Sequence, residues 1–181
     1  MLVAGVLANP NAELSTTGLV ANTGTITVSG YGKTKVNVGG VMGTHNAAKG
    51  SGYINTGDIF VTRSTADGAG NYPIYVGGIA ATASVALENA KCYCLIKASD
   101  AKDTNCFKGW MTGSSRSETV IAKNCEIGGM SVDEYNVEDE EYQGTNINAK
   151  NYFNFIYGSA DWTGVADYDG CKYISKAPAI E

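Results

Sequence analysis

Short apolar runs that alternate with turns rich in glycine and asparagine dominate the hydrophobic pattern of this 181-residue chain. In TITV at 25–28 and DIFV at 58–61, every second residue is a branched aliphatic, which places these side chains on one face of a strand. Glycine-rich turns follow both segments, at 29–32 and 66–71. No stretch before residue 130 keeps an apolar period of 3.6 residues. The pattern therefore predicts an all-β chain made of short strands.

One apolar motif built around one or two glycines recurs along the chain. It reads LVAGVLA at 2–8, NVGGVMG at 37–43 and YVGGIAA at 75–81, with weaker copies CFKGWMT at 106–112 and NFIYG at 154–158. Anchored on Gly5, Gly40, Gly78 and Gly109, the first four copies are 35, 38 and 31 residues apart. Self-similarity at such a period is the signature of a repeat architecture.

A second motif interleaves with the first. It reads NTGTITV at 22–28, NTGDIFV at 55–61, KCYCLI at 91–96, NCEI at 124–127 and DGCKYI at 169–174. With Gly24, Gly57, Cys92, Cys125 and Cys171 aligned, its steps are 33, 35, 33 and 46 residues. Because the two motifs recur with similar spacing, chance is a poor explanation for either of them. We interpret the chain as an array of about four and a half units.

Each unit holds several short strands and no helix, so it buries its apolar face only by stacking on its neighbours. This predicts one domain, residues 1–181, folded as a right-handed parallel β-helix, or β-solenoid, of about four to five coils of roughly 31–46 residues. Two inward ladders are predicted from the alignment: Val41, Ile79, Trp110 and Ile156 in one, and Ile26, Ile59, Cys94 and Ile127 in the other. An acidic insertion at 131–150 would belong to an irregular last coil. The first motif starts in mid-unit without a polar cap, so we expect a fragment of a longer protein.

Composition narrows the function classes. The chain has 44% hydrophobic but only 17% charged residues, with 23 glycines and a net charge of -5. This balance favours an extracellular β-rich protein. No basic stripe is visible, which argues against nucleic acid as a partner. No apolar run reaches the length of a membrane-spanning helix, so we expect a chain that does not span a membrane.

The five cysteines and the single histidine give weak metal signals. Cys92 and Cys94 form C-x-C rather than the C-x-x-C of zinc sites, and a zinc site would need His45 together with scattered cysteines. We expect reduced, buried thiols, since a disulfide within the proposed column of Cys92, Cys125 and Cys171 is geometrically tight. His45 is expected in a surface turn.

The other polar groups give weak signals of a functional site. The acidic cluster Asp133, Glu134, Glu138, Asp139, Glu140 and Glu141 is more often a solvated loop than a calcium site. The segment 167–170 lacks most of a calcium loop. Asp58 has no acidic partner on the next unit, where Tyr93 aligns. The sequence thus predicts no catalytic residue, no cofactor and no metal ligand.

Aromatic residues offer a binding hypothesis. Among the 11 tyrosines, Tyr31, Tyr53, Tyr72 and Tyr75 fall at or near turns, and Trp162 lies close to Tyr157 and Tyr168. Exposed aromatics along one face suit sugar rings or a partner protein. The alternative is that tyrosine is simply common on β-surfaces.

The segments VGGIAA and NTGDIFV resemble the G-G-I-x-G and N-x-G-x-I repeats of bacterial surface β-helix proteins, including the GLUG-motif type. The resemblance covers roughly residues 2–130 and departs at 106–112, where the second glycine is absent. It implies an extracellular or cell-surface location and an adhesin-type role with a host glycan or surface protein as partner. It supplies no catalytic motif. We therefore expect a non-catalytic repeat segment, an adhesion module or stalk, with a carbohydrate-active enzyme (polysaccharide lyase or glycoside hydrolase) as the alternative.

Overall fold

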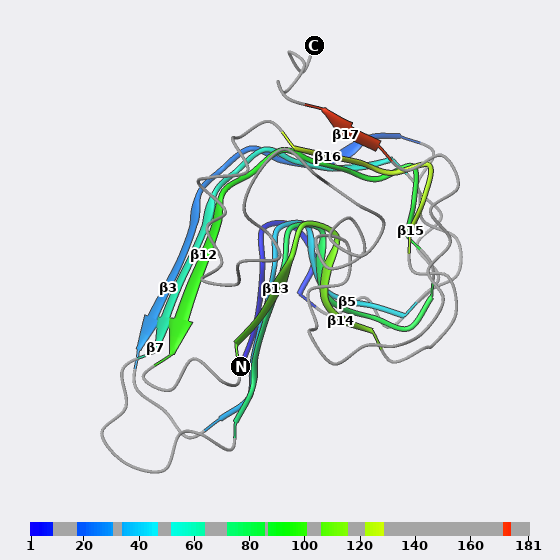
Figure 1. The fold of residues 1–181 in the computed structure, drawn as a ribbon. Coiled ribbons are helices and arrows are strands. Elements are labelled where there is room, and N and C mark those ends of the chain that lie inside the picture. The colour runs from blue at the N-terminus through cyan, green and yellow to red at the C-terminus, as the bar shows by residue number, and fades with distance from the viewer. Residues whose placement is uncertain are drawn as a thin grey trace.

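The structure is a computed structural model that describes residues 1–8, 18–30, 34–46, 52–63, 72–85, 87–100, 106–115, 122–128 and 172–174. Within these residues the protein is all-β and contains no helix, as the sequence predicts. Each strand pairs in parallel with its equivalents in the neighbouring units. Strands of the same sheet therefore follow one another along nearly the same path (Figure 1).

Five short sheets arise in this way among the described residues. Sheet A holds β1 (Leu2–Ala4), β4 (Val36–Gly39), β8 (Ile74–Gly77) and β13 (Cys106–Gly109). Sheet B holds β5 (Met42–His45), β9 (Ala80–Ala83) and β14 (Thr112–Ser115). Sheet C holds β2 (Val20–Asn22), β6 (Tyr53–Asn55), β11 (Lys91–Cys92), β16 (Glu126–Gly128) and β17 (Lys172–Ile174). Sheet D holds β3 (Ile26–Gly30), β7 (Ile59–Arg63) and β12 (Ile96–Asp100), and sheet E holds β10 (Leu87–Glu88) and β15 (Ala122–Lys123).

A sharp bend joins sheet A to sheet B at the first glycine of each pair. A Cβ on Gly39 would lie 1.6 Å from the Met42 carbonyl oxygen, and one on Gly77 would lie 1.8 Å from that of Ala80. Only glycine allows so close an approach of two backbone segments. The V-G-G motif is thus the corner at which the chain turns from β4 to β5 and from β8 to β9 (Figure 1).

The core lies between the sheets and consists of apolar columns that run from unit to unit. Val38 pairs with Val76 in sheet A, and Ile59 pairs with Ile96 in sheet D, and all four side chains are buried. The predicted inward face of the segment 58–61 is confirmed, because Ile59 and Val61 are both buried. Stacked like residues pack efficiently because the strands of neighbouring units lie only about 4.8 Å apart.

The register confirms the first part of the predicted repeat. Leu2 pairs with Asn37, and Asn37 pairs with Tyr75, which reproduces the steps of 35 and 38 residues. In the second motif, Asn22 pairs with Asn55 as expected. The last predicted step of 46 residues is also present, in the pairing of Glu126 with Lys172.

The register of the later units differs from the predicted alignment. Gly109 pairs with Gly77 rather than Gly78, so the step is 32 residues. Met111 therefore occupies the position after Trp110 that continues the Val41 and Ile79 ladder, and its carbonyl accepts hydrogen bonds from Ile79 and Ala80. The prediction that Trp110 belongs to this ladder was wrong, although the Trp110 side chain is fully buried.

The cysteine column and the second inward ladder were also misaligned. Cys92 pairs with Asn55 and with Ile127, so Cys92 and Cys125 share no column. Ile96, not Cys94, continues the ladder of Ile26 and Ile59. The predicted ladder member Ile156 and the residue Cys171 lie outside the described residues.

Candidate functional site

An amide ladder links the first two units inside the stack. The Asn22 Nδ2 donates to the Asn55 Oδ1 at 2.8 Å. Each asparagine also closes its own turn: Asn55 Nδ2 donates to the Gly57 carbonyl at 3.1 Å, and the Gly57 amide donates back to Asn55 Oδ1 at 3.2 Å. Buried amides are stable only when their donors and acceptors are satisfied, and these satisfy one another. The N-T-G motif therefore has a structural role.

The amide ladder explains why the two sequence motifs recur with similar spacing. A Cβ on Gly40 would lie 2.3 Å from the Asn55 Nδ2, and one on Gly5 would lie 2.6 Å from the Asn22 Cγ. In the third unit a Cβ on Gly78 would lie 2.2 Å from the Cys92 Sγ. The second glycine of the motif thus leaves room for the neighbouring side chain of the amide ladder. Trp110 replaces this glycine in the fourth unit, and its Nε1 donates to the Cys94 carbonyl at 3.1 Å.

Two thiols continue the ladder in the third unit. The Asn55 Nδ2 donates to the Cys94 Sγ at 3.2 Å, and the sulfurs of Cys92 and Cys94 lie 3.3 Å apart. Burial, followed by the neighbouring Cys92, raises the pKa of the Cys94 thiol well above its usual range. A protonated, buried thiol is a poor nucleophile and a poor metal ligand. Cys92, Cys94 and Cys125 are buried, as expected from the sequence.

Within the described residues, no three histidine, cysteine, aspartate or glutamate side chains gather where they would hold a metal ion. The described part of the chain also contains no helix of the length and hydrophobicity needed to cross a membrane.

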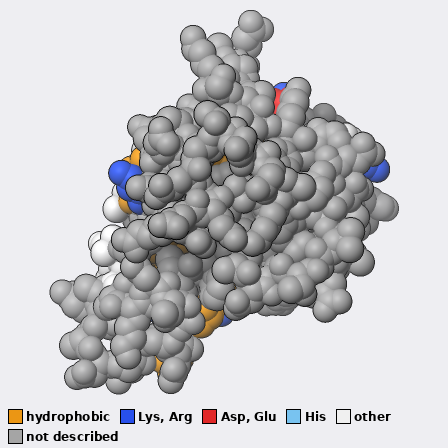
Figure 2. Space-filling view, viewed as in Figure 1, with side chains coloured by type: hydrophobic (Ala, Val, Ile, Leu, Met, Phe, Trp, Pro, Cys, Tyr) orange, Lys and Arg blue, Asp and Glu red, His pale blue; other side chains and the backbone are white. Residues whose placement is uncertain are grey.

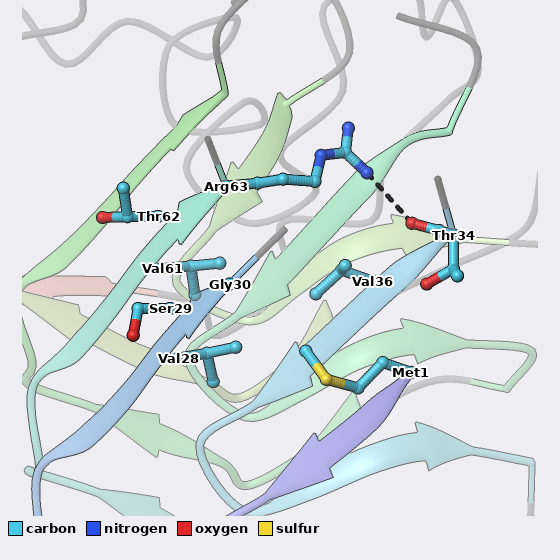
Figure 3. A pocket seen from close by; sticks show the side chains of 9 residues that line it. All are labelled: Met1, Val28, Ser29, Gly30, Thr34, Val36, Val61, Thr62 and Arg63. Carbon is cyan, nitrogen blue, oxygen red and sulfur yellow. Dashed lines mark hydrogen bonds between the residues drawn. The ribbon is translucent and has the colours of Figure 1, made fainter. Parts of the chain in front are cut away.

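A pocket of about 240 Å³ opens between the ends of sheets D and A (Figure 3). Its walls are mostly apolar, with polar groups on the rim: Met1, Val28, Ser29, Gly30, Thr34, Val36, Val61, Thr62 and Arg63. The volume is smaller than that of usual ligand sites, which are about 300–1,000 Å³.

Arg63 closes one side of this pocket and ties together two connections. It is buried, its Nη1 donates to the Thr34 carbonyl at 3.0 Å, and its Nη2 donates to the Tyr72 carbonyl (Figure 3). The guanidinium thereby fixes the chain just before β4 and just before β8. Hydrogen bonds between a charged donor and backbone carbonyls are among the stronger ones. The sequence gives no signal for this residue, since a single arginine at the end of a strand forms no recognisable motif.

A small polar cluster lies on the outer side of sheet C and its corner. The Tyr93 hydroxyl donates to Glu126 Oε2 at 2.5 Å, and Lys91 Nζ lies 3.7 Å from the same oxygen. Burial, and then the Glu126 carboxylate, raises the pKa of Tyr93. Lys91 pairs in register with Glu126, and Glu126 pairs with Lys172. Three charged residues of successive units thus share one column of sheet C.

Several residues singled out in the sequence lie elsewhere than expected. His45 is buried in β5, with its ring edge-on to that of Tyr53 at 5.8 Å, so the surface-turn prediction was wrong. Asp58 lies opposite Leu95, not Tyr93, and its Oδ1 accepts a hydrogen bond from the Leu95 amide at 2.9 Å. The carboxylate of Asp58 therefore serves the corner between sheets C and D.

Among the residues that the structure describes, the predicted aromatic side chains do not form one exposed face. Tyr53 is buried, and burial raises its pKa. Tyr72 is exposed, whereas Tyr75 lies half-buried in β8 with the Lys35 ammonium 4.6 Å from its ring centre. Tyr31, Tyr157, Tyr168 and Trp162 lie outside the described residues, as do the acidic cluster at 133–141 and the segment 167–170.

The described basic side chains visible in Figure 2 appear at separate points and form no continuous patch on that face.

Comparison with models of known protein families, with curated proteins and with solved structures gives no match in any of the three.

Proposed function

We propose that the chain is a right-handed parallel β-solenoid and acts as a non-catalytic repeat segment of a bacterial surface protein, serving adhesion or spacing outside the cell. The solenoid is supported by the parallel pairing of equivalent strands in all five sheets. The right-handed sense follows from the strong preference of parallel strands for right-handed crossovers.

The observation that carries the non-catalytic role is the use of buried polar side chains to hold units together. Asn22 and Asn55 bond to each other, Arg63 bonds to two backbone carbonyls, and Asp58 accepts from the next unit. These groups stabilise the stack and face structural partners. A stack of this kind is rigid along its axis, which suits a stalk or a flat binding face.

Outward-facing rows offer the contact surface for a partner. In sheet D, Thr27 pairs with Phe60 and Phe60 pairs with Lys97, and the side chains of Thr27 and Lys97 are exposed while that of Phe60 is half-buried. An aromatic ring flanked by polar groups suits stacking on a sugar ring. We therefore propose a host glycan or surface protein as the partner and this row as its contact.

A glycan array probed with the labelled chain, with and without calcium, tests this proposal. We expect reproducible binding to one glycan class, and at least about tenfold weaker binding for Phe60→Ala, equivalent to about 1.4 kcal/mol. Glu88→Ala, an exposed substitution in sheet E, is the matched control and should bind like the unmodified chain. A blank array with folded protein would contradict glycan recognition and leave a spacer or a protein-binding module.

The cluster of Tyr93, Glu126 and Lys91 is the observation that favours the alternative, a carbohydrate-active enzyme. Glycoside hydrolysis uses two carboxyl groups about 5–9.5 Å apart, whereas this cluster holds one. Its phenol is also kept protonated, which disfavours a role as base. Any glycan bound on the array should be incubated with the chain and assayed for new reducing ends. Turnover that Glu126→Gln abolishes would establish the enzyme instead.

A further inference from the structure

Three sheets of the stack end in edge strands at the side where the chain begins. Sheets A, C and D end at β1, β2 and β3, and within the described residues these strands pair only with the next unit. The exposed edge of a parallel sheet presents unpaired amides and carbonyls, which recruit another strand.

Apolar side chains are exposed at the same end. Met1, Val6 and Leu19 are 58%, 45% and 55% exposed, and they are three of the four large hydrophobic side chains that are exposed in the described part of the chain. Inward-facing residues of this unit are only partly buried, whereas their register partners in the second unit are fully buried. The pairs are Val3 with Val38, Val20 with Tyr53, Ile26 with Ile59 and Val28 with Val61. The core is thus open at this end.

The pocket described above belongs to the same opening. Met1 and Val28 form its outer part, and Val61 and Val36 its inner part (Figure 3). An aliphatic side chain stacked on Val28, as Val61 is stacked beneath it, would enter the pocket. The shape of the opening therefore matches one more layer of the stack.

We propose that this end, formed by β1, β2 and β3, is a docking surface for one further β-coil that runs parallel to the first unit. This inference rests on the proposed solenoid and adds the chemistry of its partner. A Cβ on Gly5 would lie 2.3 Å from the Gly40 carbonyl oxygen of the next unit. In the same way, a Cβ on Gly40 would lie 2.0 Å from the Gly78 carbonyl oxygen. The coil that docks must therefore carry glycine over Gly5.

The amide ladder sets a second requirement on the coil that docks. Asn22 donates from Nδ2 to the Oδ1 of Asn55, which lies one unit further along. By the same geometry, the docking coil needs an asparagine whose Nδ2 reaches the Oδ1 of Asn22. The occupant is accordingly a coil of the same glycine and asparagine type as residues 37–71.

A second copy of this chain is a poor occupant. Its far end carries Trp110 in place of the glycine, and the positions in register with Asn55 and Cys92 are Ile127 and then Tyr173. Two copies joined by their open ends would instead pair strands in antiparallel fashion, out of line with the parallel columns. Self-association thus fails both chemical requirements.

The test places a copy of residues 37–71 directly before Leu2, which keeps the 35-residue spacing between Leu2 and Asn37. Hydrogen exchange followed by mass spectrometry is measured in both chains. We expect amides of β1, β2 and β3 to exchange at least about tenfold more slowly in the extended chain. The matched control is the same copy with Gly40→Val, which should leave exchange in these strands as in the unextended chain.

Unchanged exchange with the intact copy would overturn the proposal, and so would equal protection by the two copies. If the extended chain does not fold, residues 37–71 are added as a separate peptide, and absence of protection again overturns it. Light scattering that shows the unextended chain as a dimer with protected β1–β3 would overturn it in favour of a second copy. Rapid exchange in β4, β6 and β7 of the unextended chain would instead contradict the proposed solenoid itself.

Discussion

At the scale of single residues, the interior of the stack is held by side chains that satisfy one another across units. Asn22 and Asn55 form amide contacts, and in the third unit Cys94 accepts where an amide oxygen would otherwise be expected. A thiol accepts a weaker hydrogen bond than an amide oxygen. The ladder is therefore strongest between the first two units.

Replacing Asn55 by alanine should destabilise the protein by about 2–3 kcal/mol, because the Gly57 amide and the Asn22 amide lose their buried acceptor. Urea denaturation followed by circular dichroism measures the loss. Asn22→Ala, at the open end of the column, should cost less. Equal losses for the two variants would contradict the importance of burial in the ladder.

Stability should fall at high pH because Tyr93 stays protonated in the fold. Its pKa is raised by burial and by Glu126, whereas in the unfolded chain tyrosine ionises near pH 10. Above that value the unfolded chain loses a proton that the folded chain retains, so the free energy of unfolding decreases as the pH rises. Below it this contribution is fully present.

The urea midpoint should thus be steady from pH 7 to 9 and decline above pH 10, with a smaller decline in Tyr93→Phe. A residual decline is expected in that variant, since burial also raises the pKa of Tyr53. An identical pH dependence in both proteins would show that Tyr93 does not carry the effect.

At the scale of the element, the bend between sheets A and B depends on the first glycine of each pair. The backbone of β5 lies so close to Gly39 that no side chain fits, and the same holds for β9 and Gly77. This bend places β4 and β5 in the middle of the cross-section, with sheets C, D and E around them (Figure 1).

Gly39→Ala should therefore destabilise the protein by several kcal/mol or prevent folding, since backbone at 1.6 Å cannot move aside cheaply. Gly30→Ala is the matched control, because a Cβ there meets nothing within 4 Å. Circular dichroism and the urea midpoint compare the two. A Gly39→Ala protein as stable as Gly30→Ala would contradict the close approach at the bend.

Sequence alone predicts the elements of the first two units well because their motifs are nearly identical. The pairing of Leu2 with Asn37 and of Asn22 with Asn55 follows directly from V-x-G and N-T-G. The later units fail because aligning identical letters is a poor guide where packing has changed. Trp110 stands at the register position of Gly78 in the fourth unit, so aligning Gly109 with Gly78 shifted the strand by one residue.

Side-chain partners were less predictable than strands. The burial of His45 against Tyr53 depends on two sheets meeting, which no local pattern reveals. The cluster of Tyr93, Glu126 and Lys91 joins residues of two units whose register had been misaligned. Contacts between units become visible only when the register is correct.

At the scale of the whole molecule, unit length varies while the register within each sheet is kept. Residues 31–35 connect β3 to β4, whereas the longer segment 64–73 connects β7 to β8. Both connections lead from sheet D back to sheet A. Extra residues at this corner are thus absorbed without displacing the strands that follow.

Four glycine and serine residues inserted after Tyr31 should accordingly lower stability by only about 0.5 kcal/mol, the entropy of a longer loop. The same insertion between Gly39 and Gly40 should abolish folding, because it separates β4 from the bend that sets β5. Circular dichroism and urea midpoints distinguish the two variants. A large loss at the first site would contradict the tolerance of this corner.

The corner between sheets D and A also gives the molecule a series of equivalent positions at regular spacing. Equivalent corners of successive units are held at the strand spacing of about 4.8 Å, whatever the length of the loop that leaves each one. Groups grafted at the same corner of each unit would stand in a straight row at that pitch. A chain built in this way could present several copies of a short peptide at fixed, closely spaced intervals.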